Sequence, residues 1–133
     1  MAAVLVVSAG CAEVPPPASP APAAAVDWSV FFEHDSTAIS ATGVATIRNA
    51  AQYARQSIKP RITLTGHTDR SGGAAYNMGL SLRRAEAVKK ALVAQGIPAD
   101  AIEARGLGES QPLVMTPDGV REPQNNRVEF TIQ

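Results

Sequence analysis

Apolar residues alternate with polar ones, or cluster in short runs, at four places along the chain. Residues 61–65 and 127–132 alternate strictly, which is the period of a half-buried strand. Residues 28–32 have the aromatic and β-branched content of a strand, and residues 101–105 are interpreted as a further strand that ends at Gly106. The pattern therefore predicts four strands.

Two other segments have the spacing of helices. The first begins at a capping residue, Ser40 or Thr42, and ends before Lys59-Pro60. The second runs from about residue 76 to 95 and is followed by the helix stop Gly96-Ile97-Pro98. The order is β-α-β-α-β-β, so we expect an α+β fold: a two-layer sandwich with both helices on one face of a mixed sheet.

Arg84 interrupts the apolar face of the second helix. At about 100° per residue, its neighbours on that face are apolar or small. They are Leu80, Ser81, Ala85, Val88, Ala91 and Leu92. An unpaired buried guanidinium costs several kcal/mol, so Arg84 must extend to solvent or find an anion. That anion could belong to a ligand, or to the same domain, for example Asp69.

The amino-terminal 26 residues differ in composition from the rest. Residues 1–11 are an uncharged apolar run that ends in small residues before Cys11, the single cysteine. This run resembles a bacterial lipoprotein signal, in which the cysteine is acylated with palmitate or a similar chain. An ordinary secretory signal or a frayed tail is the alternative. The run is too short to span a membrane, which takes about 20 apolar residues.

Residues 12–26 are rich in proline and alanine, and they predict an extended, polyproline-like linker to a single folded domain at 27–133. Wrapping of this segment around the domain is the alternative. Ala12 follows the cysteine where inner-membrane lipoproteins typically carry Asp, so the resemblance predicts a lipid anchor in the outer membrane, with the domain facing the periplasm.

Charge excludes some partners. The 12 basic and 12 acidic side chains cancel, so no overall field attracts nucleic acid or an anionic membrane. Recognition by charge must therefore be local.

One series of short motifs carries the strongest signal. It consists of Gly66-His67-Thr68-Asp69, Leu80-Ser81 with Arg84-Ala85, and Gly106-Leu107-Gly108-Glu109. In this order the motifs resemble the OmpA-like domain of outer-membrane protein A, Pal lipoproteins and MotB-type stator proteins. The resemblance covers residues 28–133. It implies non-covalent binding of peptidoglycan, which would tether the outer membrane to the cell wall, with no catalysis, cofactor or metal.

The resemblance assigns a ligand to Asp69 and Arg84. In that family, the matching Asp and Arg bind the side chain of diaminopimelate in the peptidoglycan stem peptide. The free end of this amino acid carries an ammonium and a carboxylate on one carbon, so a site needs an anion beside a cation. Asp69 would hold the ammonium and Arg84 the carboxylate, through charge-assisted hydrogen bonds.

Further residues of the expected ligand site come from the same resemblance. They are Glu33, His34, Asp35, Thr68, Asn77 and Arg127. Thr68 and Asn77 would shape the loop, although Asn77 could equally contact the ligand. Asn126 stands where the family has the middle Arg of Asn-Arg-Arg, which predicts one weaker contact to the backbone.

Two other functions are compatible with some of these residues. An enzyme could use His34, Asp35, His67 and Asp69 as metal ligands or as an acid-base pair. The two histidines lack tight metal-ligand spacing, and no G-x-S-x-G nucleophile motif is present. His67 is then a structural residue. Alternatively, the fold could serve as a scaffold that holds another envelope protein.

Overall fold

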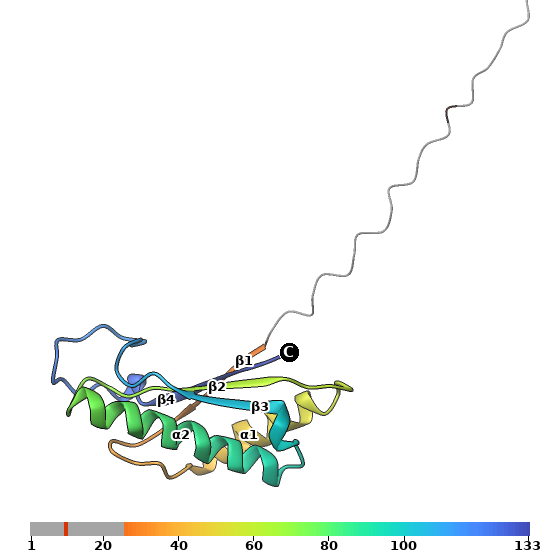
Figure 1. Ribbon diagram of the computed structural model, residues 1–133, viewed down its shortest axis with the longest axis horizontal. Helices are drawn as coiled ribbons and strands as arrows, with labels where there is room; N and C mark the ends of the chain where they lie inside the picture. The colour runs from red at the N-terminus through yellow and green to blue at the C-terminus, as the bar shows by residue number, and fades with distance from the viewer. Residues whose placement is uncertain (1–9, 11–25) are drawn as a thin grey trace, which may run out of the picture.

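The structure is a computed structural model that describes Gly10 and residues 26–133 (Figure 1). Cys11, the rest of the signal-like run and residues 12–25 of the linker lie outside the described residues. The lipid anchor and the extended linker therefore stay predictions.

Four strands form one mixed sheet in the order β1-β4-β2-β3. Their bounds are Val26–Phe31 (β1), Ile62–Gly66 (β2), Ile102–Gly106 (β3) and Arg127–Ile132 (β4). Strand β4 is antiparallel to both β1 and β2, whereas β2 and β3 are parallel. The four predicted strands and the mixed sheet are confirmed.

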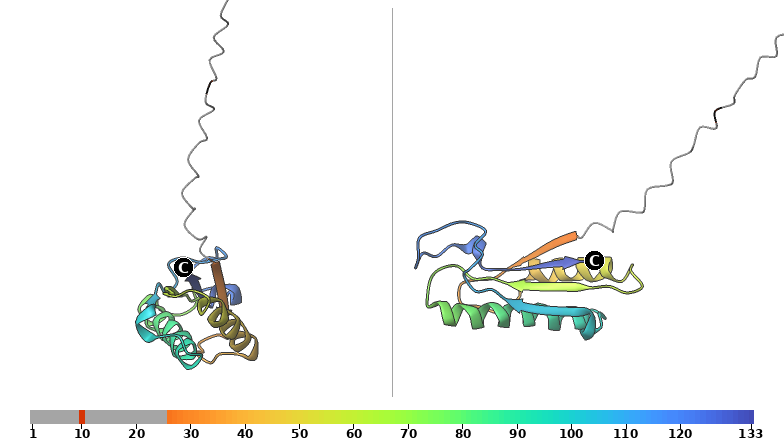
Figure 2. Two further views of the ribbon diagram at one scale, coloured as in Figure 1. Left: turned by 90° about the vertical axis from the view of Figure 1, so that its right-hand side faces the viewer. Right: turned by 45° about the horizontal axis from the view of Figure 1, so that its top comes forward.

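Both helices, α1 (Ala41–Ala54) and α2 (Ala74–Ala94), cover the same face of this sheet (Figures 1 and 2). Ser40 rather than Thr42 caps α1, because its hydroxyl accepts a hydrogen bond from the Gly43 amide at 3.1 Å. The helix ends five residues before Lys59, earlier than the sequence predicted. Two short 3-10 turns, η1 (Ala99–Ala101) and η2 (Pro123–Asn125), precede β3 and β4.

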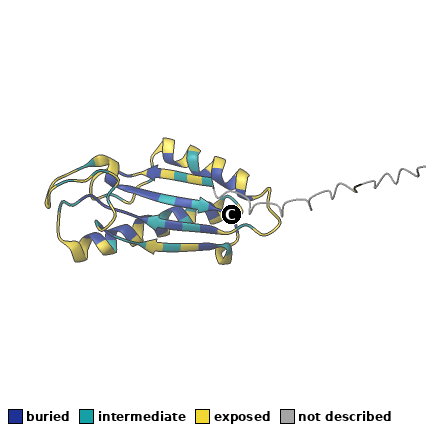
Figure 3. Ribbon diagram, turned by 90° about the horizontal axis from the view of Figure 1, so that it is seen from above, coloured by how far each residue is buried: buried dark blue, intermediate teal, exposed yellow. Residues whose placement is uncertain are grey.

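The core lies between the helices and the sheet. On β4, Val128, Phe130 and Ile132 are buried towards the helices, and the alternate residues face the other side of the sheet. Figure 3 shows the same alternation of buried and more exposed residues along the strands. On α2, the residues of the predicted apolar face are buried, Arg84 among them, except that Ala91 is half-buried, and Asn77 is buried as well.

Helix α2 packs unusually close to β2 and β3 because both strands end in glycine. A Cβ at Gly66 would lie 1.8 Å from the Ser81 carbonyl oxygen, and one at Gly106 would lie 2.6 Å from the Leu82 nitrogen. This close approach brings the first half of α2, including Arg84, against the ends of the strands.

The ends of β1, β2 and β3, the beginnings of α2 and β4, and the long β3–β4 loop all meet at one end of the molecule (Figure 1). The predicted ligand-site residues lie in or next to these segments, except Arg84, which lies half-way along α2. Among the described residues, no helix is both long and apolar enough to cross a membrane.

Candidate functional site

The side chain of Arg84 is fully buried and joins three loops. Its Nε donates to the Ser36 carbonyl at 2.8 Å, and its Nη2 donates to the Glu33 carbonyl at 3.0 Å. Its Nη1 donates to the His67 carbonyl at 3.0 Å and to Asn126 Oδ1 at 2.9 Å. The guanidinium thus ties the end of β1 to the end of β2 and the start of β4.

No carboxylate of the described residues lies within ion-pair distance of Arg84. Burial lowers the pKa of its guanidinium, and the nearby charges of Asp69 and Asp35 oppose that shift. An arginine nevertheless stays protonated in proteins. A buried positive charge therefore lies behind the loops, solvated by carbonyl oxygens instead of by a direct ion pair with Asp69.

Asp69 follows β2 and is surrounded by neutral donors. Its Oδ1 accepts from the Ser71 amide at 3.0 Å and from the Ser71 hydroxyl at 2.5 Å. Its Oδ2 accepts from Asn126 Nδ2 at 2.9 Å and from the Glu122 amide at 3.3 Å. Burial by itself would raise the pKa of this carboxyl, but the hydrogen bonds outweigh burial and the pKa lies below its ordinary value. Asp69 is therefore an anion at neutral pH.

Asn126 links the two charged residues, a role that the sequence reasoning missed. Its Oδ1 accepts from Arg84, and its Nδ2 donates to Asp69. The same Oδ1 also accepts from the Asp69 backbone amide at 3.1 Å, so Asn126 contacts the main chain of the loop after β2 as well. In the sequence, only the replacement of the middle Arg of Asn-Arg-Arg by Asn126 drew attention to this position. Its contacts to Asp69 and Arg84 depend on loops that meet only in the folded structure.

Two adjoining cavities open around this network. Their volumes are about 730 and 230 Å³. The larger extends from β1 towards the start of α1 and is mostly apolar, with Phe31, Phe32 and Ile39 in its wall. Four residues line both cavities: His34, Asp69, Arg121 and Asn126. Arg84 lines neither cavity.

Most of the other predicted site residues reach these cavities. Glu33 lines the larger one, and the smaller one is lined by Asp35, Thr68 and Asn77. The Asn77 amide donates to the Ser71 carbonyl at 3.0 Å, so this residue shapes the loop that carries Asp69.

Several residues of the smaller cavity escaped the sequence reasoning. Ser71 and Arg121 lie in loops, where no periodicity distinguishes a site residue from its neighbours. Tyr76, at the start of α2, lines the same cavity and donates a hydrogen bond from its hydroxyl to Asp35.

Arg127 lies apart from the two cavities. Its neighbour Val128 is in the core, so Arg127 faces the opposite side of the sheet. There its Nε donates to Glu129 at 2.7 Å, and its Nη2 donates to the Gln111 carbonyl at 3.3 Å. The structure therefore does not bring Arg127 together with Asp69, and we leave it out of the candidate site.

His67 is likewise buried beside Glu129, with 3.7 Å between its Nε2 and the carboxylate. Burial, and then the charge of Arg127, lower its pKa to about 4 although Glu129 opposes the shift. Across residues 26–133, no three His, Cys, Asp or Glu side chains form a cluster that could hold a metal ion.

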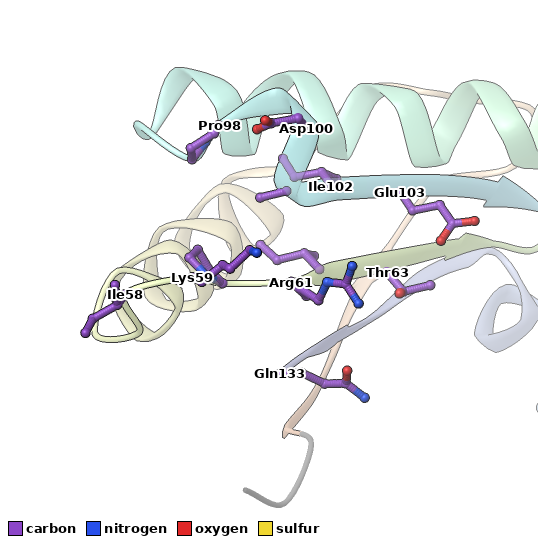
Figure 4. A pocket seen from close by; sticks show the side chains of 12 residues that line it. Ile58, Lys59, Arg61, Thr63, Pro98, Asp100, Ile102, Glu103 and Gln133 are labelled. Atoms are coloured by element: carbon purple, nitrogen blue, oxygen red, sulfur yellow. The ribbon is translucent and has the colours of Figure 1, made fainter. Parts of the chain in front are cut away.

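A further cavity, of about 440 Å³, lies at the opposite end of the sheet, where β2 and β3 begin (Figure 4). Its wall contains side chains of both signs, including Lys59, Arg61, Asp100 and Glu103. None of the predicted site residues is among those that line it.

Comparison with known proteins identifies the family of this chain. The model of the OmpA family matches residues 31–126, which include both cavities and the whole Asp69–Asn126–Arg84 network. The chain belongs to the OmpA family. A solved structure, that of the peptidoglycan-associated lipoprotein of Burkholderia pseudomallei, superimposes with a TM-score of 0.74 at 33% identity, covering 80% of this chain and 90% of the other. The fold predicted from the sequence is thereby confirmed.

Curated relatives of this OmpA-family chain include envelope proteins. An outer membrane protein of Gluconacetobacter diazotrophicus is 42% identical over 118 residues, or 84% of this chain. The peptidoglycan-associated lipoprotein of Agrobacterium fabrum is 35% identical over 98 residues, or 74% of this chain. The match spans only 31% and 55% of the length of these two relatives.

Proposed function

We propose that this OmpA-family domain binds peptidoglycan non-covalently and without catalysis. Relatives whose names state an association with peptidoglycan match most of the domain in sequence and in structure. The observation that carries the proposal is the position of Asp69: its ionised carboxylate lies in the wall shared by two cavities that open to solvent. Such a site suits a small cationic group on a longer chain.

The ligand group we propose is the free end of diaminopimelate in the stem peptide. The four hydrogen-bond donors around Asp69 are all neutral, and the imidazole Nδ1 of His34 lies 4.0 Å from its Oδ2, so no permanently charged cation pairs directly with this carboxylate at the cavity wall. A ligand ammonium could therefore form a charge-assisted hydrogen bond with the Asp69 carboxylate. The Ser71 hydroxyl lines the smaller cavity and can rotate, so its hydrogen bond is the one that an ammonium could replace.

Arg84 contributes to this site from behind the cavity wall. Because four of its five N–H groups already donate to Glu33, Ser36, His67 and Asn126, it fixes the wall and adds positive potential. A direct bond from Arg84 to the ligand carboxylate would require the Glu33–Ser36 segment to move.

We further propose that the domain acts as a tether. An acylated Cys11 would hold the chain in the outer membrane, and the proline-rich residues 12–26 would let the domain reach the cell wall on the periplasmic side. Peptidoglycan and the membrane would then be its two partners.

Sedimentation of the full chain with purified sacculi tests the function. Asp69→Ala should abolish co-sedimentation, because loss of one partner of a buried charged contact costs about 2–5 kcal/mol. The matched control is Asp100→Ala, which removes an exposed carboxylate at the opposite end of the sheet. Undiminished sedimentation of a folded Asp69→Ala protein would refute the proposal and favour the alternative role as a scaffold for another envelope protein.

A further inference from the structure

The cavity where β2 and β3 begin is lined by charges of both signs that have no ion-pair partner in the domain. Lys59 and Arg61 lie on the segment that leads into β2, and Asp100 lies in η1, just before β3 (Figure 4). All three are exposed, and none takes part in an ion pair within residues 26–133. The other carboxylate of the wall, Glu103, is already paired with Arg105 at 2.9 Å. Two free cations and one free carboxylate therefore line one cavity.

An exposed apolar side chain stands beside these charges. Ile58, in the turn between α1 and β2, has an exposed fraction of 105%, and it lines the cavity next to Lys59. Pro98, which lines the same cavity from the segment before η1, is exposed as well. A single exposed isoleucine is common on protein surfaces. An apolar side chain flanked by cations, however, is the combination that places a protein at a phospholipid surface.

The cavity lies at the end of the domain where the proline-rich segment enters the sheet. The first residue of β1, the last residue of β4 and the first residues of β2 and β3 are paired in one row across the sheet. The last two of these line the cavity. At about 3 Å per residue, residues 12–25 can span about 40 Å at most. A membrane that holds an acylated Cys11 is therefore within reach of the cavity.

We propose that this cavity binds the phosphoethanolamine headgroup of a phospholipid, and that the domain thereby docks on the membrane to which it is tethered. This inference rests on the proposed tether. Lys59 and Arg61 bind the phosphate, and Asp100 accepts hydrogen bonds from the ammonium. Ile58 enters the acyl boundary beneath the headgroups. Because β2 runs from this end towards Asp69, docking directs the Asp69 cavities away from the membrane.

The carboxylate makes the cavity selective among headgroups. The ammonium of ethanolamine carries N–H donors, whereas the trimethylammonium of choline has none, so only ethanolamine can donate hydrogen bonds to Asp100. A glycerol headgroup has no cation at all. A zwitterionic headgroup also requires no overall field, in keeping with the equal numbers of basic and acidic side chains in the sequence.

Vesicle sedimentation of the full chain carrying Cys11→Ser tests this assignment without an acyl anchor. The vesicles contain phosphatidylcholine alone, or an equal mixture with either phosphatidylethanolamine or phosphatidylglycerol, in salt of about 0.15 M. The protein should bind the ethanolamine vesicles at least about threefold more tightly than the choline vesicles. Asp100→Asn should remove this preference, because the amide no longer attracts the ammonium. Replacement of Lys59 and Arg61 together by Gln should weaken binding to all three kinds of vesicle.

The matched controls are Glu86→Gln and Lys90→Gln, which remove an exposed carboxylate and an exposed cation from α2 outside the cavity. Both should keep the full preference. Equal binding to ethanolamine and choline vesicles, tightest binding to glycerol vesicles, or a preference that survives in Asp100→Asn would each overturn the assignment. The vesicles contain no peptidoglycan, so these outcomes do not bear on peptidoglycan binding, which sedimentation with sacculi tests separately.

Discussion

The side chain of Asn126 holds Asp69 and Arg84 at opposite ends of one amide. Its Nδ2 donates to the Asp69 carboxylate at 2.9 Å, and its Oδ1 accepts from the Arg84 guanidinium at 2.9 Å. The amide therefore separates a buried cation from an anion that faces the cavities. Because the two charges do not form a direct pair, the charge of Asp69 remains available to a ligand.

Removal of this amide should destabilise the fold. Asn126→Ala leaves one donor of Arg84 and one acceptor site of Asp69 without a partner in a buried region, at a cost of about 2–4 kcal/mol. Urea unfolding followed by circular dichroism measures the loss. Gln124→Ala, two residues earlier and exposed, should stay within about 0.5 kcal/mol of wild type. Equal stability of the two variants would contradict the role assigned to Asn126.

Replacement of Arg84 should destabilise the fold and increase the mobility of the loops that its guanidinium joins. Arg84→Met leaves the carbonyls of Glu33, Ser36 and His67 without their donor, so we expect a loss of about 3 kcal/mol or more in unfolding free energy. Hydrogen exchange should accelerate in residues 33–36. The neighbouring Arg83→Met, at an exposed position of α2, provides the control. Unchanged exchange in the Arg84 variant would argue against its role in fixing the loops.

His67 should make the fold sensitive to mild acid. Its pKa is about 4 in the folded protein and about 6.5 when unfolded, so between these values the unfolded chain binds more protons. The free energy of unfolding should therefore decrease as pH falls from 6.5 to 4, by up to about 3 kcal/mol. Urea midpoints across this range measure the slope, and His67→Gln should reduce it. Identical slopes in both proteins would show that His67 is not responsible.

Substitution of the glycines at the strand ends that contact α2 should destabilise the fold. Gly66→Ala places a methyl group against the Ser81 carbonyl and should cost more than about 2 kcal/mol. Gly79→Ala, within α2, meets only the flexible end of Arg83 at 3.3 Å, and should instead stabilise by about 0.5–1 kcal/mol. Thermal unfolding shows whether each substitution lowers or raises the melting temperature. A Gly66→Ala protein as stable as wild type would mean that the contact between α2 and β2 does not need a glycine.

Palmitate labelling of the chain in a Gram-negative host tests the lipid anchor. If Cys11 is acylated, labelling should disappear in Cys11→Ser, because no other cysteine exists in the sequence. The domain should then leave the membrane fraction. Label that persists in the Cys11→Ser protein would exclude acylation of this cysteine.

Much of the fold could be predicted because the strands and helices depend on local periodicity. The alternation in residues 127–132 and the helical spacing around Leu80 and Val88 are properties of neighbouring residues. The same spacing placed Arg84 on the apolar face of α2, since position along a helix decides the face, but it left open whether the guanidinium reaches solvent. The ends of the helices were less accurate, because capping and fraying depend on a few contacts at each end.

The sequence by itself thus determined the order of the elements and the apolar face of α2 on which Arg84 lies, and its motifs predict a ligand for Asp69 and Arg84. Tertiary structure alone decided that Asn126 lies between these two, that Arg127 faces the other side of the sheet, and that Arg121 reaches the cavities. The reason is physical: periodicity orients side chains within one element, whereas loop residues are positioned by hydrogen bonds to segments far away in the chain. The Glu122 amide on Asp69, 53 residues apart, is such a bond.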